Sequence, residues 1–219
     1  MEGERTRAAR ERMVRDQLAG RGIRDGRVLA TMRVVPRHLF VEPSEEGRAY
    51  EDGPLPIGFG ATISQPYVVA AMTELLRLRG TEKVLEIGSG SGYQTAVLAE
   101  LAGEVYSVEI VPELHERAKR VLEVLGYRNV HLRCGDGARG WLEEAPFDDI
   151  LVTAAPPDVP SPLLDQLALG GRMVIPIGKE RQTLHVFEKT PKGMVREKSF
   201  EVRFVPLQGK GEKPPPAAP

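Results

Sequence analysis

Three glycines stand close together between an apolar run and a helical pattern in the stretch VLEIGSGSGYQTAVLA. Gly88, Gly90 and Gly92 lie where a strand would turn into a helix, and such a turn lets the backbone approach a nucleotide closely. The dinucleotide fingerprint G-x-G-x-x-G would require glycine at position 93, which is Tyr93. The spacing is instead E-x-G-x-G-x-G, with Glu86 ahead of the first glycine. Because glycines also serve ordinary tight turns, the pattern alone favours cofactor binding only slightly.

Acidic residues follow two further apolar runs of the same region. Glu109 lies near the end of EVYSVEI, and Asp136 lies between two glycines in GDG. At the carboxyl edge of a parallel sheet, Glu109 would meet ribose hydroxyls, and the GDG loop would approach the same ligand. Glu86 and the absence of a nearby lysine or arginine argue against a pyrophosphate and favour a cationic ligand, S-adenosylmethionine. The alternatives are a solvated strand end at Glu109 and a turn former at Asp136.

Ser64 lies in the stretch ATISQP, between a loop rich in glycine and proline and a run with helical periodicity. Two tasks are open to its hydroxyl. It can cap the helix that follows Pro66 by accepting a hydrogen bond from the amide of Tyr67 or a neighbour. It can also orient a substrate carboxylate as a neutral donor, which a transition state that neutralises charge would tolerate better than a cation. The stretch by itself leaves both tasks open.

The elements around these residues follow an alternating pattern. Apolar runs predict strands at 83–87, 104–110, 130–134, 149–154 and 172–177. Helical periodicity predicts helices between them at roughly 92–102, 112–125 and 161–168. This alternation predicts right-handed βαβ units and a doubly wound α/β fold with a mostly parallel sheet. Strand-like alternation on both sides of TPKG predicts an antiparallel pair at one edge of the sheet.

The first part of the chain precedes this alternation. Helical spacing predicts an amphipathic helix from Arg5 to Leu18, stopped by Gly20, and a second helix from about Gly26 to Met32. Residues 42–60 hold too many glycines and prolines for regular structure, and their aromatic and apolar side chains argue against disorder. We therefore expect a functional loop there.

Composition limits the classes of function. The 219 residues carry a formal net charge of −1 with acids and bases interleaved, so neither nucleic acid nor an anionic membrane is an expected partner. The single cysteine, Cys134, and four scattered histidines do not indicate a metal site, and the run VHLRC predicts a buried thiol. No segment resembles a signal peptide or an apolar span of ~20 residues, so we expect a cytoplasmic protein.

Several segments, in order along the chain, resemble those of bacterial protein-L-isoaspartate (D-aspartate) O-methyltransferases. They are VPRHLFV, AYEDGPLPIGFGATISQPYVVA, VLEIGSGSGYQTAVLA, GDGARG, DDILVTAA, QLALGGRMVIPIG and FVPL. One departure is Ala61, where bacterial members usually have glutamine. The resemblance implies a class I methyltransferase fold with N-terminal helices. It also implies methyl transfer from S-adenosylmethionine to the free α-carboxylate of L-isoaspartyl residues, the first step of their repair, and leaves D-aspartyl residues open as substrates.

The resemblance also implies roles for individual residues. The implied cofactor contacts are Thr62, Ile63, Tyr67, Glu86, Gly88, Ser89, Gly90, Gly92, Glu109, Asp136 and Gly137. The implied substrate contacts are Arg37, His38, Thr153, Ala154, Arg203 and Val205. We add the hypothesis that Ser64 is the catalytic residue and orients the reacting carboxylate without removing a proton. A carboxylate with a pKa near ~4 is already ionised at neutral pH, so no general base is required.

On this basis we expect one domain with four parts. These are N-terminal helices with a substrate loop (1–60), a methyltransferase core (61–178), C-terminal strands (179–207) and a flexible tail (208–219). The expected partners are isoaspartyl-containing proteins and peptides, the expected state is a monomer, and no metal is expected. Two alternatives stay open: a methyltransferase of the same fold acting on a small molecule or RNA, and a non-catalytic module that binds S-adenosylmethionine.

Overall fold

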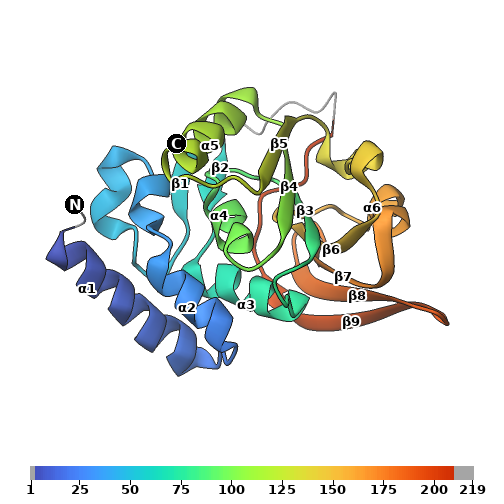
Figure 1. The fold of residues 1–219 in the computed structure, drawn as a ribbon, viewed down its shortest axis with the longest axis horizontal. Helices are drawn as coiled ribbons and strands as arrows, with labels where there is room; N and C mark the ends of the chain where they lie inside the picture. Colours follow the sequence, from blue (N-terminus) through green and yellow to red (C-terminus); the bar gives the residue numbers. More distant parts are fainter. Residues whose placement is uncertain (1–2, 210–219) are drawn as a thin grey trace.

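The computed structural model describes residues 3–209, and its centre is a seven-stranded sheet (Figure 1). Its strands are β3 (Lys83–Ile87), β4 (Glu104–Glu109), β5 (Val130–Cys134), β6 (Phe147–Val152), β7 (Leu167–Ile177), β8 (Gln182–Thr190) and β9 (Gly193–Val202). They lie in the order β5-β4-β3-β6-β7-β8-β9. The first five in this order are parallel, and β8 and β9 join them as an antiparallel pair at one edge. The predicted doubly wound fold with an antiparallel edge pair is confirmed.

Burial along the strands follows their position in the sheet. The central strands β3 and β6 are buried over almost their whole length, as expected for parallel strands that are covered on both faces. β5 lies at the edge, and most of its side chains are only half-buried or exposed. Cys134 at its end is exposed, so the prediction of a buried thiol was wrong. The run VHLRC has a strand pattern, but a pattern does not tell an edge strand from a central one.

Helices cover the sheet and extend the molecule on its N-terminal side (Figure 1). They are α1 (Glu4–Arg12), α2 (Gly26–Val34), α3 (Pro66–Leu76), α4 (Tyr93–Ala99), α5 (Pro112–Val124) and α6 (Ser161–Gln166). The first predicted helix continues beyond α1 as a π-helical segment, Met13–Leu18, and a 3₁₀ turn, Ala19–Arg21. It ends at Gly22, whose φ of 102° closes the turn, and not at Gly20 as predicted. Among residues 3–209, no helix has the length and apolar character needed to cross a membrane.

Residues 42–60 are more regular than their composition predicts. They contain a 3₁₀ helix at Pro43–Arg48 and the strand β1 (Leu55–Gly58), which pairs antiparallel with β2 (Ala61–Ile63). The hairpin turn contains Phe59, which has a φ of 53° and is 54% exposed. An ion pair between Glu42 and Arg117 connects this segment to helix α5. The expectation of an irregular loop was therefore wrong in part, because hairpin pairing compensates for the glycines and prolines.

Asp149 is a buried carboxyl group near the start of β6, and its Oδ1 accepts a hydrogen bond from the amide of Arg172 at 2.9 Å. Burial raises its pKa to about 7, and nearby Glu82 and Asp148 add to the effect. The folded protein therefore binds more protons than the unfolded chain between about pH 4 and 7, so the free energy of unfolding falls as pH rises through this window.

Asparagine at position 149 cannot ionise and keeps the acceptor for Arg172. We expect Asp149→Asn to raise the thermal unfolding midpoint by about 2–4 °C at pH 8, which corresponds to ~1 kcal/mol in a domain of this size, and to change it little at pH 5. Thermal unfolding at the two pH values measures this, with the exposed Asp165→Asn as control. A shift of equal size at both pH values would contradict the titration of Asp149.

Candidate active site

Two clefts meet at the carboxyl ends of the central parallel strands. The first cleft is lined by the glycine loop after β3, the end of β4 and the strand β2. The second cleft lies between the start of α3 and the segment that ends and follows β9. Four residues line both clefts: Thr62, Ser64, Thr153 and Val205. A group bound in one cleft therefore lies next to a group bound in the other, as transfer between two bound molecules requires.

Glu109 lies at the end of β4 in the first cleft and is almost fully buried. Its Oε2 accepts a hydrogen bond from the amide of Gly90 at 2.8 Å, and its Oε1 accepts one from the amide of Val111 at 3.0 Å. Each carboxylate oxygen keeps a further lone pair, so the group can still accept hydroxyl donors. The structure thus places Glu109 at the carboxyl edge of the sheet, as predicted, with acceptor capacity left for hydroxyl donors.

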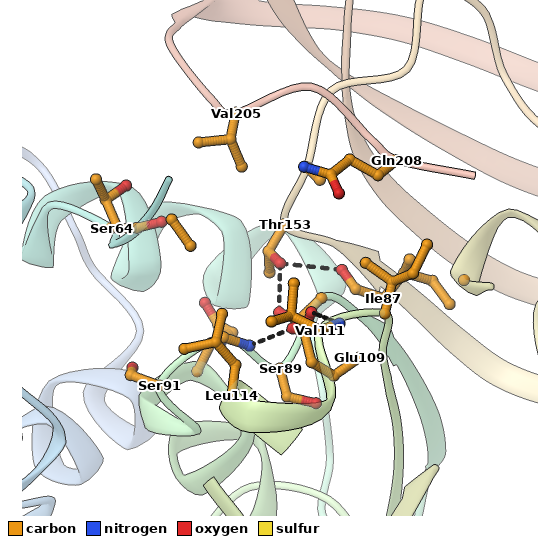
Figure 2. Close-up of a pocket in the computed structure, with 18 of the residues that line it drawn as sticks. Ser64, Ile87, Ser89, Ser91, Glu109, Val111, Leu114, Thr153, Val205 and Gln208 are labelled. Carbon is orange, nitrogen blue, oxygen red and sulfur yellow. Dashed lines mark hydrogen bonds between the residues drawn. The ribbon is translucent and has the colours of Figure 1, made fainter. Parts of the chain in front are cut away.

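The glycine loop packs so closely against Thr153 that a side chain would not fit at its first position. Gly88 has a φ of 94°, and a Cβ there would lie 2.4 Å from Oγ1 of Thr153. The Thr153 hydroxyl lies within hydrogen-bond distance of two backbone oxygens, those of Gly88 at 2.6 Å and Ile87 at 2.9 Å (Figure 2). In the loop that follows β5, a Cβ at Gly137 would lie 2.4 Å from the side chain of Ile87. Both positions therefore require glycine, because a side chain would collide with a neighbouring side chain.

Several predicted cofactor contacts do line the first cleft. They are Thr62, Ile63, Gly88, Ser89, Gly90, Glu109 and Gly137. Four others do not. Gly92 is the N-cap residue of α4 and packs against Ala118 of α5. Tyr67 lines the second cleft. Asp136 lies in a neighbouring hollow that Arg133 and Arg139 also line. Asp136 also accepts a hydrogen bond from the amide of Ala138 at 3.0 Å, which matches the alternative of a turn former.

Glu86 is the fourth of these residues, and it lies fully buried beneath the loop. Its Oε2 accepts hydrogen bonds from the hydroxyls of Thr95 and Ser107, each at 2.5 Å. Burial raises the pKa of Glu86 to about 7, the two hydroxyls oppose that rise, and the charge of Glu109 adds to it. Glu86 therefore cannot touch a ligand directly, although its charge lies close to the cleft.

Ser64 is half-buried at the junction of the two clefts and does not cap α3. The N-cap residue is Gln65, and no side chain forms a capping hydrogen bond there. Pro66 occupies the first helical position, so the helix starts too late for Ser64 to reach its free amides. The capping alternative is wrong for this residue. In Figure 2, Ser64 lies on the α3 side of the cleft, with Val205 on the segment across from it.

The predicted substrate residues divide into two groups. Thr153 and Val205 line both clefts, Ala154 lines the first and Arg203 lines the second. Backbone groups near these residues already form hydrogen bonds within the fold. The amide of Ala155 donates to the carbonyl of Val205 at 2.8 Å. This contact holds the C-terminal segment over the cleft.

Arg37 and His38 form the second group and line neither cleft. Arg37 is fully buried, donates from Nε to the carbonyl of Ala49 at 2.7 Å, and lies 4.9 Å above the ring of Tyr93. Burial lowers its pKa to about 10. Nδ1 of His38 lies 2.8 Å from the hydroxyl of Tyr50. This corrects the expectation for Arg37, because the 3₁₀ helix at Arg37–Phe40 turns its side chain into the core. His38 is half-buried, and its contact with the substrate stays a prediction.

Sequence reasoning missed the apolar walls of the first cleft. After Glu109, the chain contributes Ile110, Val111 and Leu114 to the lining. These could have been found, because residues that directly follow a strand lie at the same edge of the sheet as its last residue. The C-terminal segment contributes Leu207 and Gln208. Figure 2 labels Gln208. No local pattern marks these two, since the fold brings them to the cleft from far along the chain.

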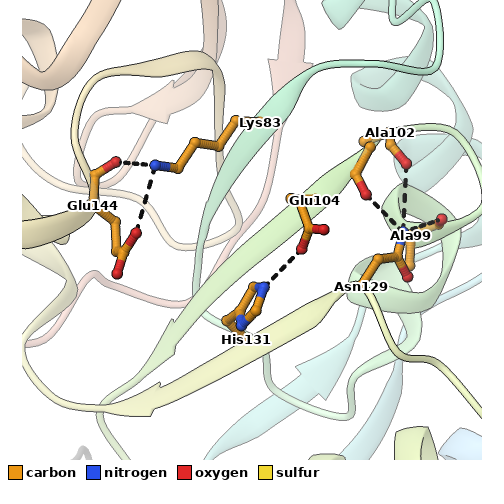
Figure 3. A network of polar contacts seen from close by, with 8 residues as sticks. Lys83, Ala99, Ala102, Glu104, Asn129, His131 and Glu144 are labelled. Carbon is orange, nitrogen blue, oxygen red and sulfur yellow. Dashed lines mark hydrogen bonds and ion pairs between the residues drawn. The ribbon is translucent and has the colours of Figure 1, made fainter.

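The side chains of His131 and Asn129 form contacts within the fold, away from the two clefts. His131 pairs with Glu104 at 2.7 Å near the amino ends of β5 and β4, at the edge of the sheet opposite the clefts (Figure 3). Nδ2 of Asn129 donates to the carbonyl of Ala99 at 2.9 Å and so satisfies the end of α4. Among residues 3–209, no three histidine, cysteine, aspartate or glutamate side chains converge in a group that could hold a metal ion.

Comparison with known proteins gives matches over nearly the whole chain. The family model of protein-L-isoaspartate(D-aspartate) O-methyltransferase matches residues 8–212. A protein-L-isoaspartate O-methyltransferase of Picosynechococcus sp. is 56% identical over 204 residues, which cover 93% of this chain and 92% of the relative. Another, from Gloeobacter violaceus, is 58% identical over 197 residues, covering 89% and 96% of the two chains.

Solved structures agree with these matches. A protein-L-isoaspartate O-methyltransferase superposes with a TM-score of 0.83 at 34% identity, over 91% of this chain and 66% of that one. A Plasmodium falciparum protein assigned to the same activity, solved in complex with S-adenosyl-L-homocysteine, gives a TM-score of 0.79 at 28% identity over 91% and 98%. The family that the sequence segments indicated is confirmed: the chain belongs to the protein-L-isoaspartate (D-aspartate) O-methyltransferase family.

Proposed function

We propose that this protein transfers a methyl group from S-adenosylmethionine to the free α-carboxylate of L-isoaspartyl residues in damaged proteins and peptides, and so starts their repair. Membership of the family supports the activity. The observation that carries the proposal for this chain is the junction of two clefts at Ser64. One cleft has the glycines and the acid that suit a nucleoside, and the other is open to a peptide.

The residues of the first cleft fit S-adenosylmethionine. Glu109 has free lone pairs for ribose hydroxyls, and Gly88, which has no side chain, lines the same cleft. Val111 and Leu114 supply apolar walls for the adenine ring. When bound, S-adenosylmethionine supplies a methyl group made electrophilic by its sulfonium. The relative from Plasmodium falciparum, solved with S-adenosyl-L-homocysteine, supports this assignment.

The role of this chain in the reaction is to position an anion that is already reactive. A carboxylate with a pKa near ~4 is ionised at neutral pH, so no residue has to remove a proton. Aligned reacting groups can gain on the order of 7–11 kcal/mol from positioning alone. In the proposed mechanism the Ser64 hydroxyl donates a hydrogen bond to one carboxylate oxygen and leaves the other oxygen free to attack.

The junction of the clefts is electrically neutral, which suits this reaction. Thr62, Ser64, Thr153 and Val205 line both clefts, and none of them is charged. A carboxylate and a sulfonium lose their charges on the way to the transition state. A cation at the junction would therefore stabilise the bound substrate more than the transition state and would slow the reaction. Arg203 lines only the second cleft, where it can meet the peptide away from the reacting atoms.

The second cleft suits the residues next to the isoaspartyl site. Tyr67 and Phe200 line it, with ring centroids 6.1 Å apart. The guanidinium of Arg21 lies 4.1 Å from the centroid of the Tyr67 ring and pairs with Asp52 at 2.9 Å. A monomer stays the expected active form. Sedimentation or light scattering of the active enzyme would check the monomer.

Labelled S-adenosylmethionine tests the proposed function directly. The protein is incubated with two peptides of identical composition, one isoaspartyl and one aspartyl, and with a structured RNA as a third acceptor. We expect base-labile methyl esters on the isoaspartyl peptide and no label on the other two. Label on the RNA would favour a different methyltransferase activity, and donor binding without transfer to any acceptor would favour a non-catalytic module.

A further inference from the structure

Asp52 is a carboxylate that holds two residues of the second cleft. Nη1 of Arg21 donates to both of its oxygens, at 3.1 Å to Oδ1 and at 2.9 Å to Oδ2. Nε2 of Gln65 donates to Oδ1 at 2.6 Å. Arg21 and Gln65 line the second cleft, whereas Asp52 lines neither cleft. Asp52 therefore acts on the second cleft through these two neighbours.

Arg21 brings a positive charge to the side of the second cleft on which Ser64 lies. Its guanidinium lies 4.1 Å from the centroid of the Tyr67 ring. Tyr67 belongs to the first turn of α3, and Ser64 lies on the α3 side of the site (Figure 2). Arg203 also lines this cleft, but it comes from the segment that follows β9. Arg21 is therefore a cation on the same side as the proposed carboxylate donor.

A free guanidinium on this side would bind the substrate too well in its ground state. The isoaspartyl carboxylate is an anion, and it loses its charge as it accepts the methyl group. An arginine that pairs with it therefore stabilises the bound substrate more than the transition state. Arginine also forms two parallel hydrogen bonds with a carboxylate, which would occupy the oxygen that has to attack. The reaction is faster when Arg21 is kept on another partner.

The structure provides Arg21 with such a partner. The side chains of Arg21 and Asp52 are each 43% exposed, so their ion pair alone is weak. The position of the guanidinium over the ring of Tyr67 adds a second attraction. The segment before Asp52 is itself held, because Nε2 of Gln17 donates to the carbonyl of Tyr50 at 2.9 Å. Arg21 is thus fixed from two sides.

We propose that Asp52 is a positioning residue that holds the guanidinium of Arg21 on the ring of Tyr67 and away from the reacting carboxylate. The inference rests on the proposed function, because it assumes an isoaspartyl carboxylate at Ser64. Asp52 neutralises the cation on the Ser64 side of the cleft. The hydroxyl of Ser64, and not a cation, then orients the substrate.

The kinetics of Asp52→Asn on an isoaspartyl peptide test this role. Asparagine keeps an oxygen that can accept from Gln65, and it removes the charge that holds Arg21. We expect KM and kcat to fall together, each by about 5-fold, and kcat/KM to stay within about 2-fold, because tighter ground-state binding raises the barrier by an equal amount. Titration calorimetry of the peptide into the S-adenosylhomocysteine complex should show binding tighter by about 5-fold.

Two further variants separate this role from a general effect of charge. Glu51→Gln removes an equal charge from the neighbouring residue, whose side chain pairs with Arg48. We expect Glu51→Gln to keep kcat and KM within about 2-fold of the unmodified enzyme. The double variant Asp52→Asn/Arg21→Gln has no cation to release. We expect it to recover most of the kcat that Asp52→Asn loses.

Three results would overturn the role of Asp52. They are unchanged constants in Asp52→Asn, a rise in its KM, and a loss of kcat that the double variant does not recover. The last two would make Asp52 a structural support of the cleft and not a restraint on Arg21. If the unmodified protein transfers no methyl group to the isoaspartyl peptide, the proposed function fails instead, so the two failures are distinguishable.

Discussion

Replacing Ser64 with alanine is expected to lower kcat about 100-fold at saturating S-adenosylmethionine and isoaspartyl peptide. Ser64 lies where the two clefts meet, and its hydroxyl is the donor proposed to hold the carboxylate in line with the methyl group. Loss of alignment by about 1 Å can cost on the order of 10²-fold in rate. Initial rates of methyl ester formation on an isoaspartyl peptide measure the effect.

The same variant separates a catalytic serine from a structural one. Because Ser64 forms no capping hydrogen bond with α3, Ser64→Ala should keep the thermal unfolding midpoint within experimental error. A lost cap would instead cost ~1 kcal/mol of unfolding free energy. Ser64→Thr keeps a hydroxyl and serves as the matched control, with an expected loss well below that of alanine. Normal turnover in Ser64→Ala would remove Ser64 from the mechanism.

Replacing Gly88 with alanine is expected to weaken S-adenosylhomocysteine binding by about 100-fold. The new Cβ would lie 2.4 Å from Oγ1 of Thr153, and the φ of 94° is one that side chains rarely adopt. Either the loop or Thr153 must move, and both line the first cleft. Thr153 also holds the backbone oxygens of Ile87 and Gly88, so the shift would spread along the loop. Titration calorimetry of the folded variant measures the change.

Gly126→Ala is the control for backbone strain without a clash. Gly126 follows α5 with a φ of 83°, and nothing lies within 4 Å of a Cβ built there. Alanine at such a position costs about 1 kcal/mol of stability through its backbone conformation. We expect Gly126→Ala to be less stable and to bind S-adenosylhomocysteine normally. If Gly88→Ala also lost only stability, close approach of this glycine to the ligand would be disproved.

The strands and the glycine loop were predictable because their signals are local. The bounds of β3 and β5 agree with the predicted 83–87 and 130–134, since short apolar runs between turn residues set them. Gly88 and Glu109 were found as candidates because the carboxyl ends of neighbouring parallel strands share one edge. The errors at Cys134 and Arg37 concern burial, which depends on what packs against an element and leaves no trace in its own pattern.

The sequence by itself determined the family, the order of strands and helices, and the position of the glycine loop at the carboxyl end of β3. Periodicity, glycine spacing and shared segments are properties of neighbouring residues, so they can be read without a fold. The tertiary structure decided that Ser64 lines the same two clefts as Thr153 and Val205, that Tyr67 belongs to the second cleft, and that Glu86 is fully buried. These relations join residues far apart in the chain, and only the pairing of strands and the packing of α3 against them bring such residues together.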